Sequence, residues 1–153
     1  MLAAALVSLA CAATPVHGEP LPKSGGLSQL KWVQATPHRA GLVGMLFAFD
    51  KDTSGDPPRL TLWAGGKAPG TGPNQKILWV IRNRGETPTI AVRGTQIGGT
   101  GGSFKQEFHA VGGTDPVGTS YASIVNVPHA GCWRLDVSSG RVKGSLVVQV
   151  VVQ

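Results

Sequence analysis

The sequence predicts an all-β domain, a sandwich or a barrel, on three observations. Short apolar stretches recur about every 8 to 12 residues and are separated by turn residues, which is the pattern of such folds. The chain contains 22 Gly and 11 Pro among its 153 residues, and this composition favours frequent turns over long helices. A hydrophobic fraction of 41% with only 14% charged residues excludes wholesale disorder, and the length suits one domain with a real core.

Nine strands are expected from this pattern. They are 30–36, 41–49, 59–64, 75–83, 88–97, 103–111, 119–127, 131–138 and 142–152. No convincing helix is expected after the N-terminal segment, and no internal repeat is visible.

The period-2 alternation of side chains assigns faces to the strands. In 131–138, Trp133 points to the core, while Cys132, Arg134 and Asp136 lie on the opposite face. Both faces of 75–83 are mostly apolar, which is typical of a central strand.

The sequence pattern predicts three segments along the chain. Residues 2–13 form an uncharged run that is too short to cross a bilayer and suits the apolar part of a signal peptide. We therefore expect a signal peptide or lipoprotein signal segment over 1–18, a flexible Pro-, Gly- and Ser-rich tether over 19–29, and a β-sandwich domain over 30–153.

Two processing routes remain open. Val16-x-Gly18 fits a small-residue cleavage site and would free a chain that begins at Glu19. Alternatively, Leu9-Ala10-Cys11 resembles the end of a bacterial lipobox, with Cys11 as the lipidated first residue. A lipid on Cys11 would anchor the protein to a membrane without a spanning helix.

The cysteine count bears on the stability of the domain. Cys11 and Cys132 are the only two cysteines. If Cys11 is lipidated or removed, Cys132 has no intrachain partner, so we expect a domain without an internal disulfide. We expect Cys132 to be a buried small hydrophobe, as free cysteines usually are; the alternative is a disulfide to another chain.

Two stretches resemble a known group of proteins. The stretch from Tyr121, YASIVNVPHAGCWRLDV, precedes a glycine turn and a Val-rich strand, and the stretch from Lys76 reads KILWVIR. Both are similar to segments of small uncharacterised exported bacterial proteins with an immunoglobulin-like fold. The resemblance implies export and an immunoglobulin-like antiparallel β-sandwich of about seven to nine strands. It brings no catalytic residues.

One acidic loop has the composition of a cation site. Asp50, Asp52 and Ser54 alternate before Gly55 and Asp56, as in the first half of a calcium loop. Thr61 occupies the position of the expected bidentate Glu, so a solvated turn between strands is the favoured interpretation.

Catalytic and metal motifs are missing from the sequence. It contains no Gly-x-Ser-x-Gly elbow, no His-Glu-x-x-His motif and no phosphate loop. His129-x-x-Cys132 supplies only half of a soft metal site. We expect a protein that is not an enzyme and has no cofactor.

The charge balance points to an anionic partner. The formal net charge is +6, and Lys76, Arg82, Arg84 and Arg93 are expected on two consecutive strands and their turn, where they would share a face or rim. Outside the cytoplasm the expected targets are anionic lipid headgroups, cell-wall polymers or an acidic protein surface, rather than nucleic acid.

Two functional hypotheses follow. The first is an exported or lipid-anchored, non-enzymatic β-sandwich that binds another macromolecule, as an envelope interaction protein or an accessory subunit of a membrane complex. The second is a small-ligand module for carbohydrate or calcium, which would use Trp63 and the 50–56 loop.

Overall fold

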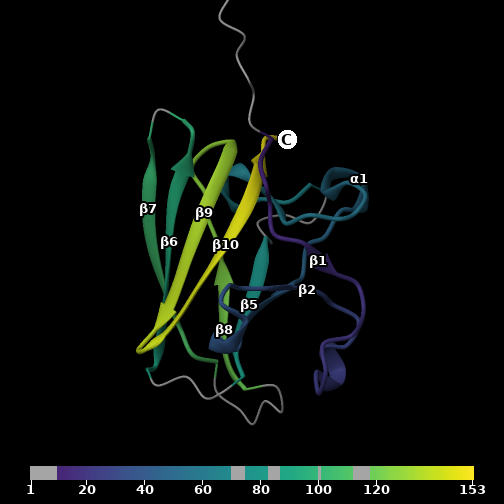
Figure 1. Ribbon diagram of the computed structural model, residues 1–153, viewed down its shortest axis with the longest axis vertical. Helices are drawn as coiled ribbons and strands as arrows, with labels where there is room; N and C mark the ends of the chain where they lie inside the picture. Colours follow the sequence, from purple (N-terminus) through teal and green to yellow (C-terminus); the bar gives the residue numbers. More distant parts are fainter. Residues whose placement is uncertain (1–9, 70–74, 83–86, 100, 112–117) are drawn as a thin grey trace, which may run out of the picture.

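The computed structural model describes residues 10–69, 75–82, 87–99, 101–111 and 118–153. Over these residues the chain forms ten strands in two five-stranded sheets that face each other (Figure 1). The expected all-β, sandwich-like character is thus confirmed.

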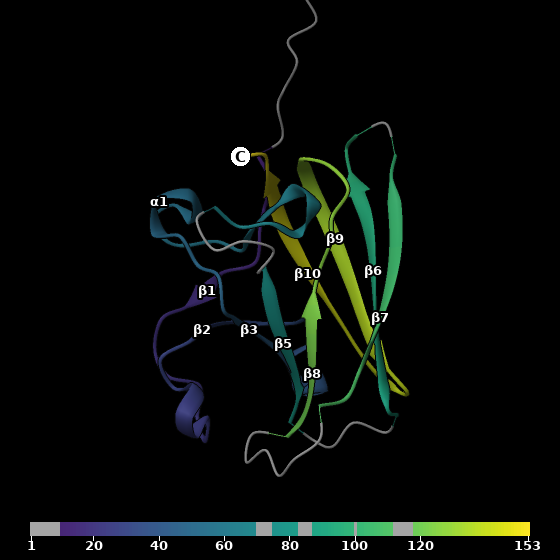
Figure 2. The ribbon, with the colours of Figure 1, turned by 180° about the vertical axis from the view of Figure 1, so that it is seen from behind.

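The two sheets are built mostly from antiparallel neighbours. The first sheet has, in spatial order, β1 (Val16–His17), β2 (Lys31–Gln34), β3 (Leu42–Leu46), β5 (Lys76–Ile81) and β8 (Thr119–Ile124). The second has β4 (Thr61–Trp63), β10 (Val142–Val151), β9 (Gly131–Ser139), β6 (Thr89–Ile97) and β7 (Ser103–His109). The pair β4–β10 is parallel. Figure 2 shows the molecule from the side of the first sheet.

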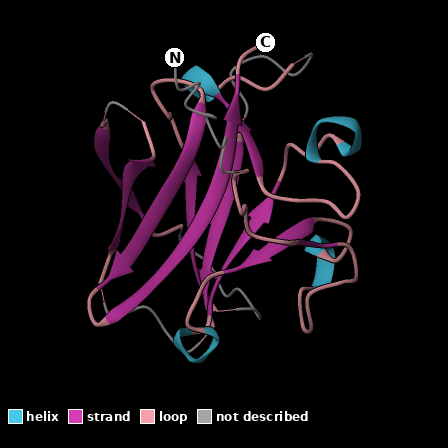
Figure 3. Ribbon diagram, turned by 45° about the horizontal axis from the view of Figure 1, so that its top comes forward, coloured by secondary structure: helices cyan, strands magenta, loops and turns pink. Residues whose placement is uncertain are grey.

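Helical segments are short and lie around the sheets (Figure 3). They are the α-helix α1 (Lys51–Ser54) and three 3-10 turns, η1 (Gly25–Leu27), η2 (His38–Ala40) and η3 (Ala64–Gly66). In the described part of the chain, no helix has the length and apolar character needed to cross a membrane.

The main core lies between the two sheets. Its largest fully buried side chains include Trp79, Tyr121 and Trp133. The indole Nε1 of Trp133 donates a hydrogen bond of 3.0 Å to the carbonyl oxygen of His129, so its one polar atom is satisfied. Arg134, its neighbour in β9, is exposed, which confirms the expected face assignment.

A second apolar cluster covers the outer face of the first sheet. Leu78 and Val80 of β5 and Met45 of β3 pack there against Leu21, which is 1% exposed. The expected flexible tether over 19–29 is therefore wrong, because this segment folds over the sheet. The physical reason is the apolar character of both faces of β5, since the outer face also has to be removed from water.

The N-terminal segment is bonded to the second sheet as well. Cys11 forms a disulfide with Cys132 of β9, with 5.4 Å between the Cα atoms, and Val16 is 8% exposed. The boundary expected after residue 18 is not a boundary of the folded unit, although 1–9 lie outside the described residues. The expectation of an unpaired, buried Cys132 is also wrong, because the fold brings its partner across 121 residues of sequence.

Replacing Trp133 tests the main core. Trp133→Ala should lower the free energy of unfolding by about 3–5 kcal/mol, because it leaves a large cavity between the sheets. Chemical denaturation measures this loss. Arg141→Ala, in an exposed turn, serves as a control and should change stability by less than about 0.5 kcal/mol. A loss below about 1 kcal/mol for Trp133→Ala would contradict its central position.

Removing the disulfide tests the attachment of the N-terminal segment. Cys11→Ser and Cys132→Ser should each destabilise the oxidised protein by about 2–5 kcal/mol, because the link closes a long loop in the unfolded chain. The double variant should lose little more than either single variant, since both remove the same bond. Additive losses, measured by urea unfolding, would contradict the link.

Candidate anion-binding site

Two adjoining hollows lie along β10 and over the outer face of the second sheet. The larger, of about 780 Å³, lies between residues 12–15 and β10, and the smaller, of about 490 Å³, lies over β9, β6 and β7. Their walls have four residues in common, namely Thr36, Pro37, Arg134 and Ser145. We call the combined depression the basic groove.

The sheet register aligns polar side chains across the groove. Ser145 of β10 lies opposite Asp136 of β9, Asp136 lies opposite Arg93 of β6, and Arg93 lies opposite Lys105 of β7. Because neighbouring strands are about 4.8 Å apart, this row of four side chains spans about 14 Å. Residues on either side of the row in β9 and β10 are buried, so the row itself faces outward.

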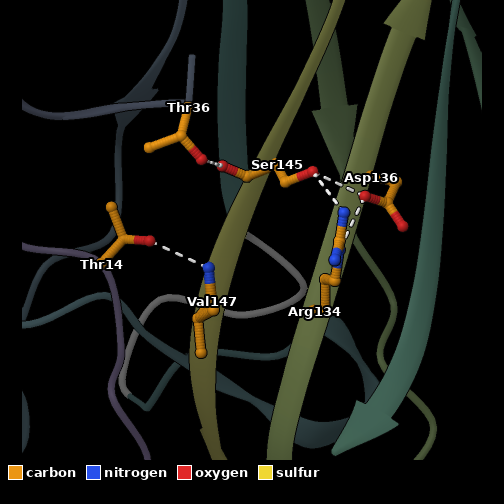
Figure 4. A network of polar contacts seen from close by, with 6 residues as sticks. All are labelled: Thr14, Thr36, Arg134, Asp136, Ser145 and Val147. Carbon is orange, nitrogen blue, oxygen red and sulfur yellow. Dashed lines mark hydrogen bonds and ion pairs between the residues drawn. The ribbon is translucent and has the colours of Figure 1, made fainter. Parts of the chain in front are cut away.

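The acidic member of this row is already engaged. Arg134 Nε donates a hydrogen bond of 2.9 Å to Asp136 Oδ1, and Ser145 Oγ donates one of 2.6 Å to the same oxygen (Figure 4). Arg134 Nη2 also donates to Ser145 Oγ at 3.2 Å. The three side chains therefore form a closed triangle at the junction of the two hollows.

The triangle keeps the Asp136 carboxylate charged. Partial burial by itself would raise the pKa of this carboxyl, but the hydrogen bonds from Ser145 and Arg134 and the charges of Arg134 and Arg93 outweigh burial. The net result is a pKa below its ordinary value of 3.8.

Positive charge in the groove exceeds the negative charge beside it. Five lining side chains are cationic, namely Arg59, Arg93, Lys105, Arg134 and Lys143, and Asp136 is the one carboxylate among the described lining residues. The described acids form no ion pair with Arg93, Lys105 or Lys143. Like charges directly opposite on neighbouring strands repel, as in the Arg93–Lys105 pair, and a bound anion would relieve this repulsion.

The N-terminal segment and the end of β2 form one wall of the groove. Val147 N donates to Thr14 Oγ1 at 2.9 Å, as Figure 4 shows. Thr14 N donates in turn to Val147 O at 2.8 Å. Thr36 and Ser145 exchange backbone hydrogen bonds of 3.0 and 2.8 Å. These amides are occupied, so the long cationic side chains are the groups left to bind a ligand.

The basic residues predicted as one surface are not brought together. Lys76 and Arg82 belong to β5 and the residue after it, in the first sheet, whereas Arg93 lies in the second sheet. Arg82 Nη2 donates to Pro22 O at 3.3 Å, and Lys76 Nζ lies 4.7 Å from the ring centre of Phe47. Arg84 lies outside the described residues. The prediction is corrected because these consecutive strands belong to different sheets.

The acidic loop weighed as a weak calcium candidate contains the short helix α1. Asp50 caps α1, since its carboxylate accepts from Asp52 N at 3.0 Å and from Thr53 Oγ1 at 2.6 Å. These hydrogen bonds lower the pKa of the Asp50 carboxyl. Ser54 is 7% exposed, and no cluster of three or more His, Cys, Asp or Glu suited to a metal is present among the described residues. Asp50, Asp52 and Asp56 therefore do not form such a cluster in the described structure.

The tryptophans and the histidine weighed as ligand groups have other roles. Trp63, which the small-ligand hypothesis would use, is 3% exposed and is held by Gln75, whose Nε2 donates to Trp63 O. Trp32 stacks on His17, with 4.2 Å between the ring centres. The ring of His129 lies against Trp133 at 5.4 Å, and Cys132 is committed to its disulfide.

Four groove cations were missed by sequence reasoning, namely Arg59, Lys105, Arg134 and Lys143. Alternation along β9, β7 and β10 is the signal that could have found Arg134, Lys105 and Lys143, because it places each of them on the exposed face of its strand. The missing information was the strand order β10-β9-β6-β7, which makes those faces one surface.

The depressed pKa of the Asp136 carboxyl predicts a pH dependence of stability. A group with a lowered folded-state pKa stabilises the fold above its unfolded-state pKa, and this contribution is lost as the pH falls through the folded-state value. We therefore expect the wild type to exceed Asp136→Asn in stability at neutral pH, and the difference to shrink below about pH 4. Urea unfolding over a pH series measures this difference, and a difference that does not change with pH would contradict the assignment.

No family model, curated protein or solved structure matches the chain at a significant level. Neither a fold family nor an activity can thus be transferred from a known protein. What the protein does is inferred from the charge and geometry of the basic groove.

Proposed function

We propose that the protein is an exported, non-enzymatic β-sandwich domain that binds an anionic polymer of the cell envelope. The observation that carries the proposal is a group of three groove cations, Arg93, Lys105 and Lys143, that form no ion pair with any described acid. The one carboxylate among the described groove residues is already bonded to Arg134. Such a concentration of one sign of charge attracts and orients polyanions. The protein would act as an envelope interaction protein or as the binding subunit of a larger assembly.

The groove favours a flexible polyanion over a folded acidic protein. Protein interfaces are centred on aromatic and large apolar anchors, and the described lining residues include no Phe, Tyr or Trp. The cations are spread over a length of at least about 14 Å, which matches a chain with repeated charges better than one isolated anion. Phosphate and carboxylate are the two charge types that such a polymer would present.

The disulfide supports the proposed location outside the cytoplasm. Disulfides persist in oxidising compartments and are rare in the cytoplasm, and the Cys11–Cys132 bond joins distant parts of this chain. An immunoglobulin-like arrangement remains part of the proposal. It is supported by two facing, largely antiparallel sheets with Trp79 and Trp133 buried between them.

The small-ligand alternative has weaker support. Its two expected contacts are Trp63, which is buried, and Asp50, whose carboxylate caps α1. A carbohydrate without charge would also leave the groove cations without partners.

The proposal predicts opposite effects of removing cations and removing the acid. Titration of the protein with inorganic polyphosphate should show binding that weakens with added salt. The double variant Arg93→Ala/Lys105→Ala should bind at least about tenfold more weakly, equivalent to about 1.4 kcal/mol. Asp136→Asn should bind more tightly than the wild type, because it removes the negative charge that competes for Arg134.

A matched control distinguishes binding in the groove from general attraction to the net charge of the protein. Lys51→Ala/Lys67→Ala removes the same charge at exposed positions outside the groove, and it should change the affinity less than about twofold. Equal losses in both double variants would show attraction to net charge alone and contradict the groove. Titration with poly-L-glutamate in parallel shows whether the groove binds carboxylates or phosphates more tightly. Binding to neither polymer would overturn the proposal.

A further inference from the structure

The outer edge of β7 is a free sheet edge in the described part of the chain. β7 ends the second sheet, and β6 is the one described strand that forms a ladder with it. Just after β7, Ala110 N donates to Pro88 O at 2.7 Å, on the side of β6. Val111 N donates to Ser120 O at 2.8 Å, on the opposite side. Because successive residues of a strand direct their backbone groups to opposite sides, the odd-numbered residues of β7 direct theirs away from β6.

Four residues of β7 therefore direct their backbone groups to the free edge, namely Ser103, Lys105, Glu107 and His109. Their N–H and C=O groups have no hydrogen-bond partner among the described residues. Their side chains are exposed as well, whereas Phe104, Gln106 and Phe108 between them are half-buried. An edge of this kind can accept a further strand, which then forms main-chain hydrogen bonds with it.

The charges along this edge are complementary to themselves. Lys105 and Glu107 lie on the exposed face of β7, on either side of Gln106. If a second β7 pairs antiparallel about Gln106, Lys105 lies opposite the partner's Glu107 and Glu107 lies opposite the partner's Lys105. Pairing centred on Lys105 would instead place two lysines opposite each other, and pairing centred on Glu107 would do the same with two carboxylates. The charges therefore favour the register centred on Gln106.

The same register suits the backbone and the half-buried face of β7. It sets odd-numbered residues opposite odd-numbered residues, so the free N–H and C=O groups of the two copies meet as hydrogen-bonded pairs. On the other face, Phe104 lies opposite the partner's Phe108, and both side chains pack against the core of their own copy. Aromatic pairs across antiparallel strands stabilise the pairing.

We propose that the protein pairs with a second copy of itself through β7, in a two-fold dimer whose second sheets form one continuous sheet. An interface of this symmetry needs a surface that is complementary to itself, and the β7 edge meets this requirement. Lys105 still has donors for a ligand, because an ammonium group has three. The dimer goes beyond the proposed anion binding, which is a property of each copy, and it sets the two basic grooves on the same face of the joined sheet.

Sedimentation of the oxidised full chain, without any polyanion, tests the pairing. We expect a monomer–dimer equilibrium in which the dimer fraction rises with protein concentration. Lys105→Glu and Glu107→Lys should each weaken dimerisation at least about tenfold, because each variant turns both cross-strand ion pairs into like-charge pairs. Wild-type protein that stays monomeric up to about 1 mM would overturn the proposal.

An equimolar mixture of the two variants tests the register. Each Lys105→Glu chain can pair with a Glu107→Lys chain, and both cross-strand pairs then join opposite charges again. We therefore expect the mixture to recover most of the wild-type dimerisation, although each variant alone is largely monomeric. This recovery also shows that both variants are folded. A mixture that stays monomeric, or a dimer that neither reversal weakens, would contradict pairing through β7.

A control variant and the choice of measurement keep this proposal separate from the proposed function. Lys51→Glu makes the same charge change in α1, which lies on the other side of the molecule from β7 (Figure 1), and should leave dimerisation unchanged. An equal loss in this variant would show that net charge and not the β7 edge controls association. Because the sedimentation samples contain no polyanion, absence of the dimer does not affect the anion-binding proposal, and absence of polyphosphate binding does not affect the dimer.

Discussion

The outer edge of β10 is the constraint on which much of the structure depends. Along one side β10 pairs with β9 over nearly its whole length, but on the other side β4 reaches only Gln149–Val151. An unpaired strand edge exposes backbone donors and acceptors that can pair with a strand of another chain. The chain covers the rest of this edge with Thr14 at Val147 and Thr36 at Ser145, and both segments come from the neighbourhood of the first sheet. The same contacts therefore cover the edge and connect the two sheets.

The segments that cover the edge of β10 also create the groove. The covering segments stand beside the outer face of β10 and β9, so a hollow remains between them and the long side chains of the sheet. The disulfide holds the start of this wall against β9, close to the cations that would meet a ligand. The stability of the fold and the shape of the proposed binding groove thus depend on the same segment of fewer than ten residues, and loss of that segment would affect both.

The charges of the groove are compatible both with stable folding and with the proposed binding of an anion. The charge of Asp136 is balanced by Arg134, and the hydrogen bond from Ser145 stabilises its ionised form, so the pKa of the carboxyl lies below its ordinary value. Arg93 and Lys105 stay exposed, where water screens their repulsion at modest cost. The fold tolerates this repulsion because the strands below are held by a core that contains Trp133 and Leu135.

The sequence by itself determined the all-β class and nine of the ten described strands, all but β1, because alternation is a local property of an extended backbone. It placed Trp133 inward and Arg134 and Asp136 outward, as the structure has them. Only the tertiary structure decided which strands are neighbours, and with this the pairing of Cys11 with Cys132, the folding of 19–29 over the first sheet, and the assembly of the groove. These features join residues far apart in the chain, and the contacts that bring them together depend on packing and edge pairing, which no local pattern encodes.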